Sequence, residues 1–452
     1  MSDLTTHSRL TISTIAAQLR TGTVTSEQVT AACLRQIAEL NPRLNAFITI
    51  LADQALAEAR SADRELAAGT DRGPLHGVPI SLKDLIDVAG SPTTAASQVR
   101  QGSIARTDAQ VVARLRHAGA VIIGKCNLHE FAYGTTSDDS AFGPVRHPFD
   151  PSRSPGGSSG GSAVAVATGM SIASVGTDTG GSIRIPAALC GIVGLKPGHH
   201  EVSLAGIVPL SSSLDHVGPM TCSVEDAWIL FKAMRGEADP MPRESMDLRQ
   251  VRLGVPRSYF FDILDDEVRA RFDESVGRLR TAGVEIQDVW IPHAADAGPI
   301  YLHIQAPEAA SYHARSLEQQ PDAYTPNVRW RLEAGRYLLA EDYVRAQRGR
   351  HVLRREVDAT LETCQALLLP TVPIPAPPIG ASEVNVGGRM ESVRSVMLRL
   401  TQLFNLTGHP VIAMPAGVTT SGFPCGLQLV GRRGGTDTLL ELARACEELN
   451  GV

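Results

Sequence analysis

The 452-residue sequence lacks a strong excess of charge of either sign, and it lacks long apolar runs. Lys and Arg number 42 against 48 Asp and Glu, which gives a formal net charge of −6. Because proteins bind the phosphates of nucleic acids with concentrated Lys and Arg, this balance argues against nucleic acid as a partner. The longest apolar runs, such as residues 120–124, are far shorter than the ~20 residues that cross a bilayer. We therefore expect no nucleic acid and no membrane as partner.

Cysteine is sparse and follows no recognisable pattern. The seven cysteines are an odd number and include no C-x-x-C pair, which favours buried, reduced thiols over a disulfide framework. No H-E-x-x-H motif or Cys/His cluster occurs, so the sequence predicts no metal site and no cofactor. The N-terminal residues carry neither the basic nor the apolar region of a secretory signal. Together these absences predict a cytoplasmic protein.

What is present is an alternation of short apolar runs with helical stretches. Helices are predicted at 26–41, 51–68, 266–282 and 436–449. Strands are predicted at 78–82, 121–123, 172–175, 253–255, 284–286, 367–369, 411–414 and 427–430. Strands that alternate with helices indicate a largely parallel or mixed sheet, so the sequence predicts one large α/β domain. Residues 295–345 break the alternation and are expected to form a helical insertion.

Two Gly-Gly-Ser clusters, at residues 152–170 and 176–191, are the most unusual segments. Small residues suit places where the backbone approaches a ligand, and free N–H groups in such turns can bind anionic groups. Flexible loops are one interpretation, but a linker would not enclose the apolar segment between the clusters. A nucleotide site is disfavoured because neither cluster has G-x-G-x-x-G or a following lysine. The near-Walker string at 119–126 has Cys126 where Ser or Thr is required.

A serine nucleophile is the third interpretation of these clusters. Residues 156–160 match G-x-S-x-G literally, but that elbow needs a preceding strand, and no histidine has a diagnostic setting. Lys83 ends a predicted apolar strand, where burial would lower the pKa of its amine. A salt bridge to Asp84 or to another carboxylate is the structural alternative for this lysine. A serine paired with a neutral lysine is a known arrangement of nucleophile and base.

Six sequence blocks, taken in order, resemble the amidase signature family. They lie at residues 77–84, 124–134, 154–167, 176–197, 408–417 and 424–431. The resemblance implies a single domain over residues 1–452, in which helices cover both faces of a twisted, mixed β-sheet core. It further implies N-terminal helices over 8–70, a catalytic core over 71–235 and a helical insertion at about 295–345 that forms part of the substrate pocket.

The family's catalytic residues carry over to matching positions. The resemblance implies Ser182 as the nucleophile, Ser158 as a proton relay that follows a cis peptide bond, and Lys83 as the base. Asp178 and Arg184 would brace the nucleophile loop, with an ordinary surface ion pair as the alternative. The oxyanion hole would consist of the main-chain N–H groups of Thr179, Gly180, Gly181 and Ser182.

The substrate is less well defined by the resemblance. Ala132 and Tyr133 align with a loop that lines the acyl pocket in relatives. Aromatic residues of the insertion are expected to form the far wall, with core packing as the alternative: Tyr301, Tyr312, Tyr324, Trp330 and Tyr337. Because few charges lie near the motifs, an uncharged, moderately hydrophobic or aromatic amide is favoured, with a carbamate (urethane) as a further candidate and esterase as a side activity.

The expected enzyme is a monomer or homodimer that hydrolyses a small-molecule amide or carbamate without a cofactor. The alternative is the glutaminase component of a tRNA-dependent amidotransferase, which works with partner chains. A catalytically silent scaffold is disfavoured, because all three catalytic positions are intact. A cysteine nucleophile at Cys126 or Cys190 is disfavoured too: Cys126 stands where the family often has Thr, and a small core residue tolerates that exchange.

Overall fold

The computed structural model describes residues 10–450, and an eleven-stranded mixed sheet runs through its centre. Parallel pairing joins β2 to β3 and β4, and β7 to β8 and β9; the remaining neighbours are antiparallel. The strand order is β1 (Phe47–Ile50), β3 (Val121–Cys126), β2 (Pro79–Lys83), β4 (Ala173–Asp178), β6 (His216–Thr221), β5 (Val193–Lys196), β12 (Val411–Val418), β13 (Pro424–Val430), β9 (Ala366–Pro370), β7 (Arg252–Pro256) and β8 (Glu285–Val289).

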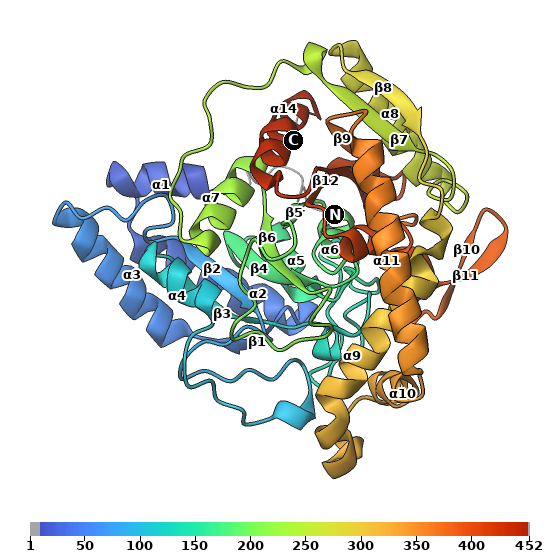
Figure 1. Ribbon diagram of the computed structural model, residues 1–452. Helices are drawn as coiled ribbons and strands as arrows, with labels where there is room; N and C mark the ends of the chain where they lie inside the picture. Colours follow the sequence, from blue (N-terminus) through green and yellow to red (C-terminus); the bar gives the residue numbers. More distant parts are fainter. Residues whose placement is uncertain (1–9, 451–452) are drawn as a thin grey trace.

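Helices flank this sheet on both faces. The N-terminal helices α1 (Ile12–Arg20), α2 (Ser26–Leu44), α3 (Ala52–Ala67) and α4 (Gln110–His117) gather on one side of the molecule, drawn in blue to cyan in Figure 1. Helices α9 (Ala297–Gln319), α10 (Pro326–Gly335) and α11 (Ala340–Leu361) form the opposite side, in orange. The other helices are α5 (Gly160–Ala167), α6 (Arg184–Cys190), α7 (Val224–Arg235), α8 (Asp266–Thr281), α12 (Val393–Leu398), α13 (Gln402–Thr407) and α14 (Thr436–Asn450).

The predicted α/β fold with a mixed, helix-covered sheet is confirmed. Each of the eight predicted strands and each of the four predicted helices is present, with ends shifted by a few residues. The apolar face predicted for α8 is buried at Val268, Phe272, Val276 and Leu279. The predicted insertion contains α9, α10 and the start of α11, which continues to Leu361. Strands β1, β5 and β6 and the hairpin of β10 (Glu383–Val386) and β11 (Arg389–Ser392) were not predicted.

Two neighbouring parallel strands, β2 and β4, position the candidate site. Strands β2 and β4 pair in register at Leu82 and Val175, so their carboxyl ends, Lys83 and Asp178, lie at the same edge of the sheet. The loop before α5 and the loop between β4 and α6 reach this edge. Within residues 10–450, no helix combines the length and the apolar character that crossing a membrane requires.

Candidate active site

Lys83 is completely buried at the end of β2. Its Nζ donates hydrogen bonds to Ser158 Oγ at 2.7 Å and to Thr177 Oγ1 at 2.9 Å. Burial lowers the pKa of Lys83 to about 7, although the charges of Asp178 and Asp215 act in the opposite direction. A large share of this amine is therefore uncharged at neutral pH.

The alternative partner proposed for Lys83 is engaged elsewhere. Asp84 Oδ1 lies 2.9 Å from Lys125 Nζ, and both side chains are fully buried. Lys125 also donates to Pro92 O at 3.1 Å. The predicted alternative of a salt bridge between Lys83 and Asp84 is therefore wrong, and the lysine of the near-Walker string has a structural partner.

Ser158 follows a cis peptide bond from Gly157, as the resemblance implies. Its carbonyl accepts hydrogen bonds from Ser137 Oγ at 3.1 Å and from the His129 N–H at 3.2 Å. A Cβ at residue 157 would lie 2.8 Å from Ser137 N, so only glycine fits there. The turn that carries Ser158 is thereby held against the end of β2.

Ser182 lies in the loop between β4 and α6, directly beside the first Gly-Ser turn. The Ser159 N–H donates to the Ser182 carbonyl at 3.2 Å, and Ser159 Oγ donates to Thr177 O at 3.1 Å. Ser182 itself is 5% exposed. The structure thus brings the segments of all three predicted catalytic residues to one place.

The loop before Ser182 presents unused donors. Among residues 10–450, no acceptor contacts the main-chain N–H groups of Gly180, Gly181 and Ser182. Gly181 has φ of +145°, a conformation that favours glycine, and a Cβ on it would meet the Thr401 side chain. Successive free N–H groups in such a loop form a concavity that suits an anionic oxygen.

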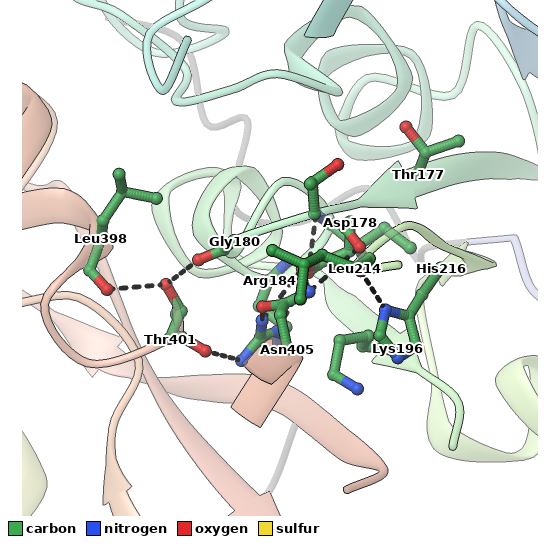
Figure 2. Close-up of polar contacts among 12 residues, drawn as sticks. Thr177, Asp178, Gly180, Arg184, Lys196, Leu214, His216, Leu398, Thr401 and Asn405 are labelled. Carbon is green, nitrogen blue, oxygen red and sulfur yellow. Dashed lines mark hydrogen bonds and ion pairs between the residues drawn. The ribbon is translucent and has the colours of Figure 1, made fainter. Parts of the chain in front are cut away.

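Asp178 and Arg184 hold this loop from beneath (Figure 2). Arg184 Nε and Nη2 each donate to the Asp178 carboxylate at 2.9 Å, and both residues are fully buried. Asn405 Nδ2 donates to Asp178 Oδ1 at 2.8 Å, while Thr401 Oγ1 donates to Gly180 O at 2.6 Å. Burial alone would raise the pKa of Asp178, but the charge of Arg184 lowers it far below its usual range. The alternative of an ordinary surface pair is therefore wrong.

Four further residues of the site were not predicted from the sequence: Thr177, Asp215, Thr401 and Asn405. Asp215 Oδ1 accepts a hydrogen bond from Thr179 Oγ1 at 2.6 Å, and its Oδ2 accepts from the Leu210 N–H at 2.9 Å. Burial raises the pKa of Asp215 to about 6. Thr177 lies within the second Gly-Gly-Ser cluster but was given no role, whereas no motif marked Asp215, Thr401 and Asn405, because their roles arise from contacts between distant segments.

The predicted pocket residues Ala132 and Tyr133 occupy a buried turn. The Tyr133 carbonyl accepts a hydrogen bond from Arg331 Nη1 at 2.6 Å, which ties the turn to α10. Tyr301 of α9 is buried too, and a Cβ at Gly180 would lie 2.7 Å from its Oη. Tyr301 therefore borders the nucleophile loop.

The other aromatic residues of the insertion do not form one wall. Tyr324 is buried and its Oη lies 2.9 Å from His313 Nδ1. Tyr312, Trp330 and Tyr337 are 44%, 69% and 85% exposed, so the expectation that they enclose the pocket is wrong. Tyr312 lies on α9 and Trp330 on α10, and both helices form the outer surface here (Figure 1), whereas Tyr337 follows the end of α10.

Cysteine and metal chemistry find no support in the part of the chain described. Cys126 and Cys190 are fully buried, and burial raises the pKa of Cys126 to about 12 and also raises that of Cys190. Such thiols are poor nucleophiles at neutral pH. In residues 10–450, no group of three or more His, Cys, Asp or Glu side chains is arranged to hold a metal ion.

Comparisons with known proteins agree with this geometry. A family model described as Amidase matches residues 28–440. The chain is 40% identical over 438 residues to an amidase of Pseudomonas putida, covering 93% of this chain and 91% of the relative. It is 39% identical over 478 residues to a glutamyl-tRNA(Gln) amidotransferase subunit from Roseiflexus sp. (strain RS-1), covering 98% and 96%. A solved structure described as an amidase has a TM-score of 0.92 at 39% identity, covering 97% of this chain and 99% of its own.

These matches identify the chain as a hydrolase that acts on C–N bonds. The matches extend over nearly the whole chain, so the chain belongs to the amidase signature family.

Proposed function

We propose that this chain is a self-sufficient amidohydrolase that cleaves the C–N bond of a carboxamide, such as an aryl amide or a carbamate, through an acyl-enzyme on Ser182. The contact of 2.7 Å between Lys83 Nζ and Ser158 Oγ carries the proposal. A buried amine whose pKa is lowered to about 7 suits a general base that operates at neutral pH.

The reaction begins with two proton transfers. Neutral Lys83 accepts the proton of the Ser158 hydroxyl, and Ser158 Oγ takes the proton of Ser182 as Ser182 Oγ attacks the carbonyl carbon. Thr177 Oγ1, at 2.9 Å from Nζ, keeps the amine directed toward Ser158. The proton held on Lys83 later restores the Ser158 hydroxyl, after Ser158 has given its own proton to the leaving nitrogen.

The negative charge that develops on the carbonyl oxygen needs donors that are already in place. The main-chain N–H groups of Thr179, Gly180, Gly181 and Ser182 supply them. The ion pair of Asp178 and Arg184 and the hydrogen bond from Thr401 to Gly180 O hold this loop. Losing one donor of this kind typically costs about 2.7–4 kcal/mol of transition-state stabilisation.

Collapse of the tetrahedral intermediate releases the amine. Ser158 donates its proton to the leaving nitrogen and is reprotonated by Lys83, so the C–N bond breaks and the acyl group stays on Ser182. Water then attacks the ester, with its proton following the same route, and the carboxylic acid leaves. A carbamate would follow the same route: the amine leaves first, an alkoxycarbonyl group stays on Ser182, and water releases it as a carbonate monoester, which breaks down to the alcohol and carbon dioxide.

The test is hydrolysis of a panel of nitroanilides, simple amides, esters and carbamates by the purified chain and by Ser182→Ala. We expect turnover by the wild type, none by Ser182→Ala, and an unchanged melting temperature. Ser152→Ala is a matched control, because this exposed serine precedes the first Gly-Ser turn and its hydroxyl bonds only to Asp150. Appreciable activity in Ser182→Ala would remove this residue from its role.

The second candidate function is that of a glutaminase acting within a complex, which the similarity to the Roseiflexus amidotransferase chain favours. Such a protein would release ammonia from glutamine mainly when its partner chains are present. Assaying the purified chain on glutamine and on a nitroanilide separates the two. Activity on the anilide alone supports the first proposal, whereas activity that requires glutamine and partner chains supports the second.

A further inference from the structure

The buried carboxylate of Asp215 has no part in the proton transfers of the proposed reaction. It directly precedes β6 and is 7% exposed. Its Oδ1 accepts a hydrogen bond from Thr179 Oγ1 at 2.6 Å, and its Oδ2 accepts from the N–H groups of Leu210 and Ser211 at 2.9 and 3.1 Å. Within residues 10–450, no Lys, Arg or His nitrogen lies within 4.0 Å of this carboxylate. A buried charge without an ion pair destabilises a protein, so a functional role would explain its presence.

The pairing of β4 with β6 places Asp215 beside the end of β4. Asp178, the last residue of β4, lies opposite His216, the first residue of β6. Continuing this antiparallel register by one residue brings Thr179 opposite Asp215, where the structure has the hydrogen bond between them. Because side chains alternate along a strand, Thr177 and Thr179 lie on one face and Asp178 lies on the other. The hydroxyls of the two threonines therefore point to the same side of the sheet.

These two threonines connect Asp215 to the catalytic amine. Lys83 Nζ donates to Thr177 Oγ1 at 2.9 Å, and Thr179 Oγ1 donates to Asp215 on the same side of the strand. Burial lowers the pKa of Lys83 to about 7, while the negative charges of Asp178 and Asp215 act against burial and raise this pKa. The Asp215 carboxylate therefore favours the ammonium form of Lys83 from beyond hydrogen-bond distance.

Several other ionisable groups lie around Asp215. They are Asp178 of β4, His216 of β6, Tyr301 and Glu308 of α9, and Arg350 of α11. The charge of Asp178 is matched by its ion pair with Arg184, and Arg350 donates to two main-chain carbonyls. The two rings are neutral at pH 7, because burial lowers the pKa of the histidine and raises that of the tyrosine. Burial and the charge of Glu308 raise the pKa of Asp215 to about 6. At neutral pH the Asp215 carboxylate is therefore mostly ionised, and its charge acts on the catalytic amine.

We propose that Asp215 is a positioning residue whose charge stabilises the ammonium that forms when Lys83 takes the proton of Ser158. Its hydrogen bond to Thr179 also holds the first donor of the oxyanion loop. The inference rests on the proposed amidohydrolase function and adds to it the group that sets the strength of the base. Burial keeps the amine neutral before the reaction, whereas a fixed negative charge becomes favourable once the cation exists. The proton stays on Lys83 until it restores the Ser158 hydroxyl, and none is transferred to Asp215.

The kinetic test is Asp215→Asn, which removes the charge and keeps an oxygen for the Thr179 hydroxyl. The midpoint of kcat/KM for a nitroanilide against pH should fall by about 0.5–1 unit, because Lys83 loses a charge that raises its pKa. The plateau above the midpoint should fall by about 10-fold, because the amine is then a weaker base. Thr179→Val removes the hydrogen bond and keeps the charge, so its plateau should fall while its midpoint moves less. Equal midpoints in the wild type and in Asp215→Asn would overturn the inference.

A second substitution and a matched control separate loss of the charge from loss of the fold. Asp215→Ser removes the same charge and leaves room for a water at the two N–H groups, so its midpoint should fall as it does in Asp215→Asn. Asp226 is also a buried carboxylate whose pKa burial raises to about 6, and it accepts hydrogen bonds from the N–H groups of Ile12 and Ser13. The charges that raise the pKa of Lys83 come from two other carboxylates. Asp226→Asn should therefore lower the melting temperature and leave both the midpoint and the plateau unchanged.

NMR of the lysines separates this inference from the proposed function. The chain contains only four lysines, Lys83, Lys125, Lys196 and Lys232. Labelling lysine at Cε therefore gives few signals, and the signal lost in Lys83→Met belongs to Lys83. The pH titration of this signal is followed in Ser182→Ala, with and without Asp215→Asn, and it needs no turnover. A lower Lys83 midpoint with Asp215→Asn supports the inference even if the wild type cleaves no amide, in which case only the proposed function fails. An unchanged midpoint beside normal anilide cleavage by the wild type would overturn the inference and leave the function standing.

Discussion

At the scale of single residues, the state of one amine controls the proposed chemistry. Lys83 must be neutral to accept a proton, and burial lowers its pKa to about 7. The rate should therefore rise with pH through a midpoint near 7 and level off above it, because the protonated form below the midpoint cannot act as a base. Measuring kcat/KM for a nitroanilide at pH values on both sides of this midpoint checks whether the rate rises or falls with pH. A rate that peaks in acid and has fallen by pH 7 would contradict the assignment.

Two buried lysines on neighbouring strands should respond to the same substitution in opposite ways. Lys83→Met removes the base and an amine that burial disfavours, so turnover should fall by about 10²- to 10⁴-fold while the melting temperature does not fall. Lys125→Met leaves the buried Asp84 carboxylate without its ion-pair partner, which should cost about 3–5 kcal/mol of unfolding free energy. Activity assays and urea unfolding of both variants measure the contrast. Equal stability losses would mean that Lys83 is as structural as Lys125.

At the scale of elements, the loop between β4 and α6 depends on close packing against α9. A Cβ at Gly180 would lie 2.7 Å from Tyr301 Oη, so Gly180→Ala should displace the loop and lower kcat. Tyr301→Phe removes the clashing oxygen. Gly180→Ala should therefore lower kcat less in the Tyr301→Phe background than in the wild type. Gly277→Ala serves as control, since a Cβ there meets nothing within 4 Å. Independent effects of the two substitutions in a double-mutant cycle would argue against this contact.

The helices and strands that could be predicted from the sequence are those whose own residues show an apolar run or a helical periodicity. Strands β9 and β12 begin with apolar runs, and α8 repeats Val268, Phe272 and Val276 on one face. By contrast, β6 contains Gly218 and Pro219, residues that disfavour strands, and it forms because it pairs with β4 and β5. Local pattern cannot reveal a strand that its neighbours impose.

The residues of the site also fall into two groups, those that a sequence motif marks and those that no motif marks. Lys83, Ser158 and Ser182 were predicted because they lie in blocks that resemble a family, and their segments do meet. The residues that hold the nucleophile loop, such as Asp215 and Asn405, come from distant segments with no motif of their own. Their roles in the site follow from tertiary packing, which cannot be seen in a single sequence.

At the scale of the whole molecule, the site depends on contacts between parts of the chain that lie far apart in the sequence. Arg184, next to the nucleophile loop, contacts Thr401, Asn405 and, at 3.4 Å, Gln428 of β13. These contacts join segments more than 200 residues apart in sequence. Unfolding of the segment from Thr401 to Gln428 would therefore disturb the loop that carries Ser182.

The reactivity of the thiols reports on the same packing, because all seven cysteines are buried and reduced in the described chain. They are distributed from α2 to α14, at Cys33, Cys126, Cys190, Cys222, Cys364, Cys425 and Cys446. The reactive form of cysteine is the thiolate, and burial raises the pKa of Cys33 and Cys446 to about 12. Iodoacetamide should therefore neither label nor inactivate the native enzyme, whereas in denaturant it should label every thiol.

Mass spectrometry of the intact protein, read beside residual activity, measures both outcomes. A reducing agent should leave activity unchanged, since no disulfide joins cysteines in the described residues. If a single label appeared in the native state and activity fell in proportion, a thiol would lie in the site, and the serine assignment would have to give way. If labels instead appeared together as denaturant is added, their midpoint should coincide with loss of activity, because the same packing buries the thiols and places Ser182 beside Ser158.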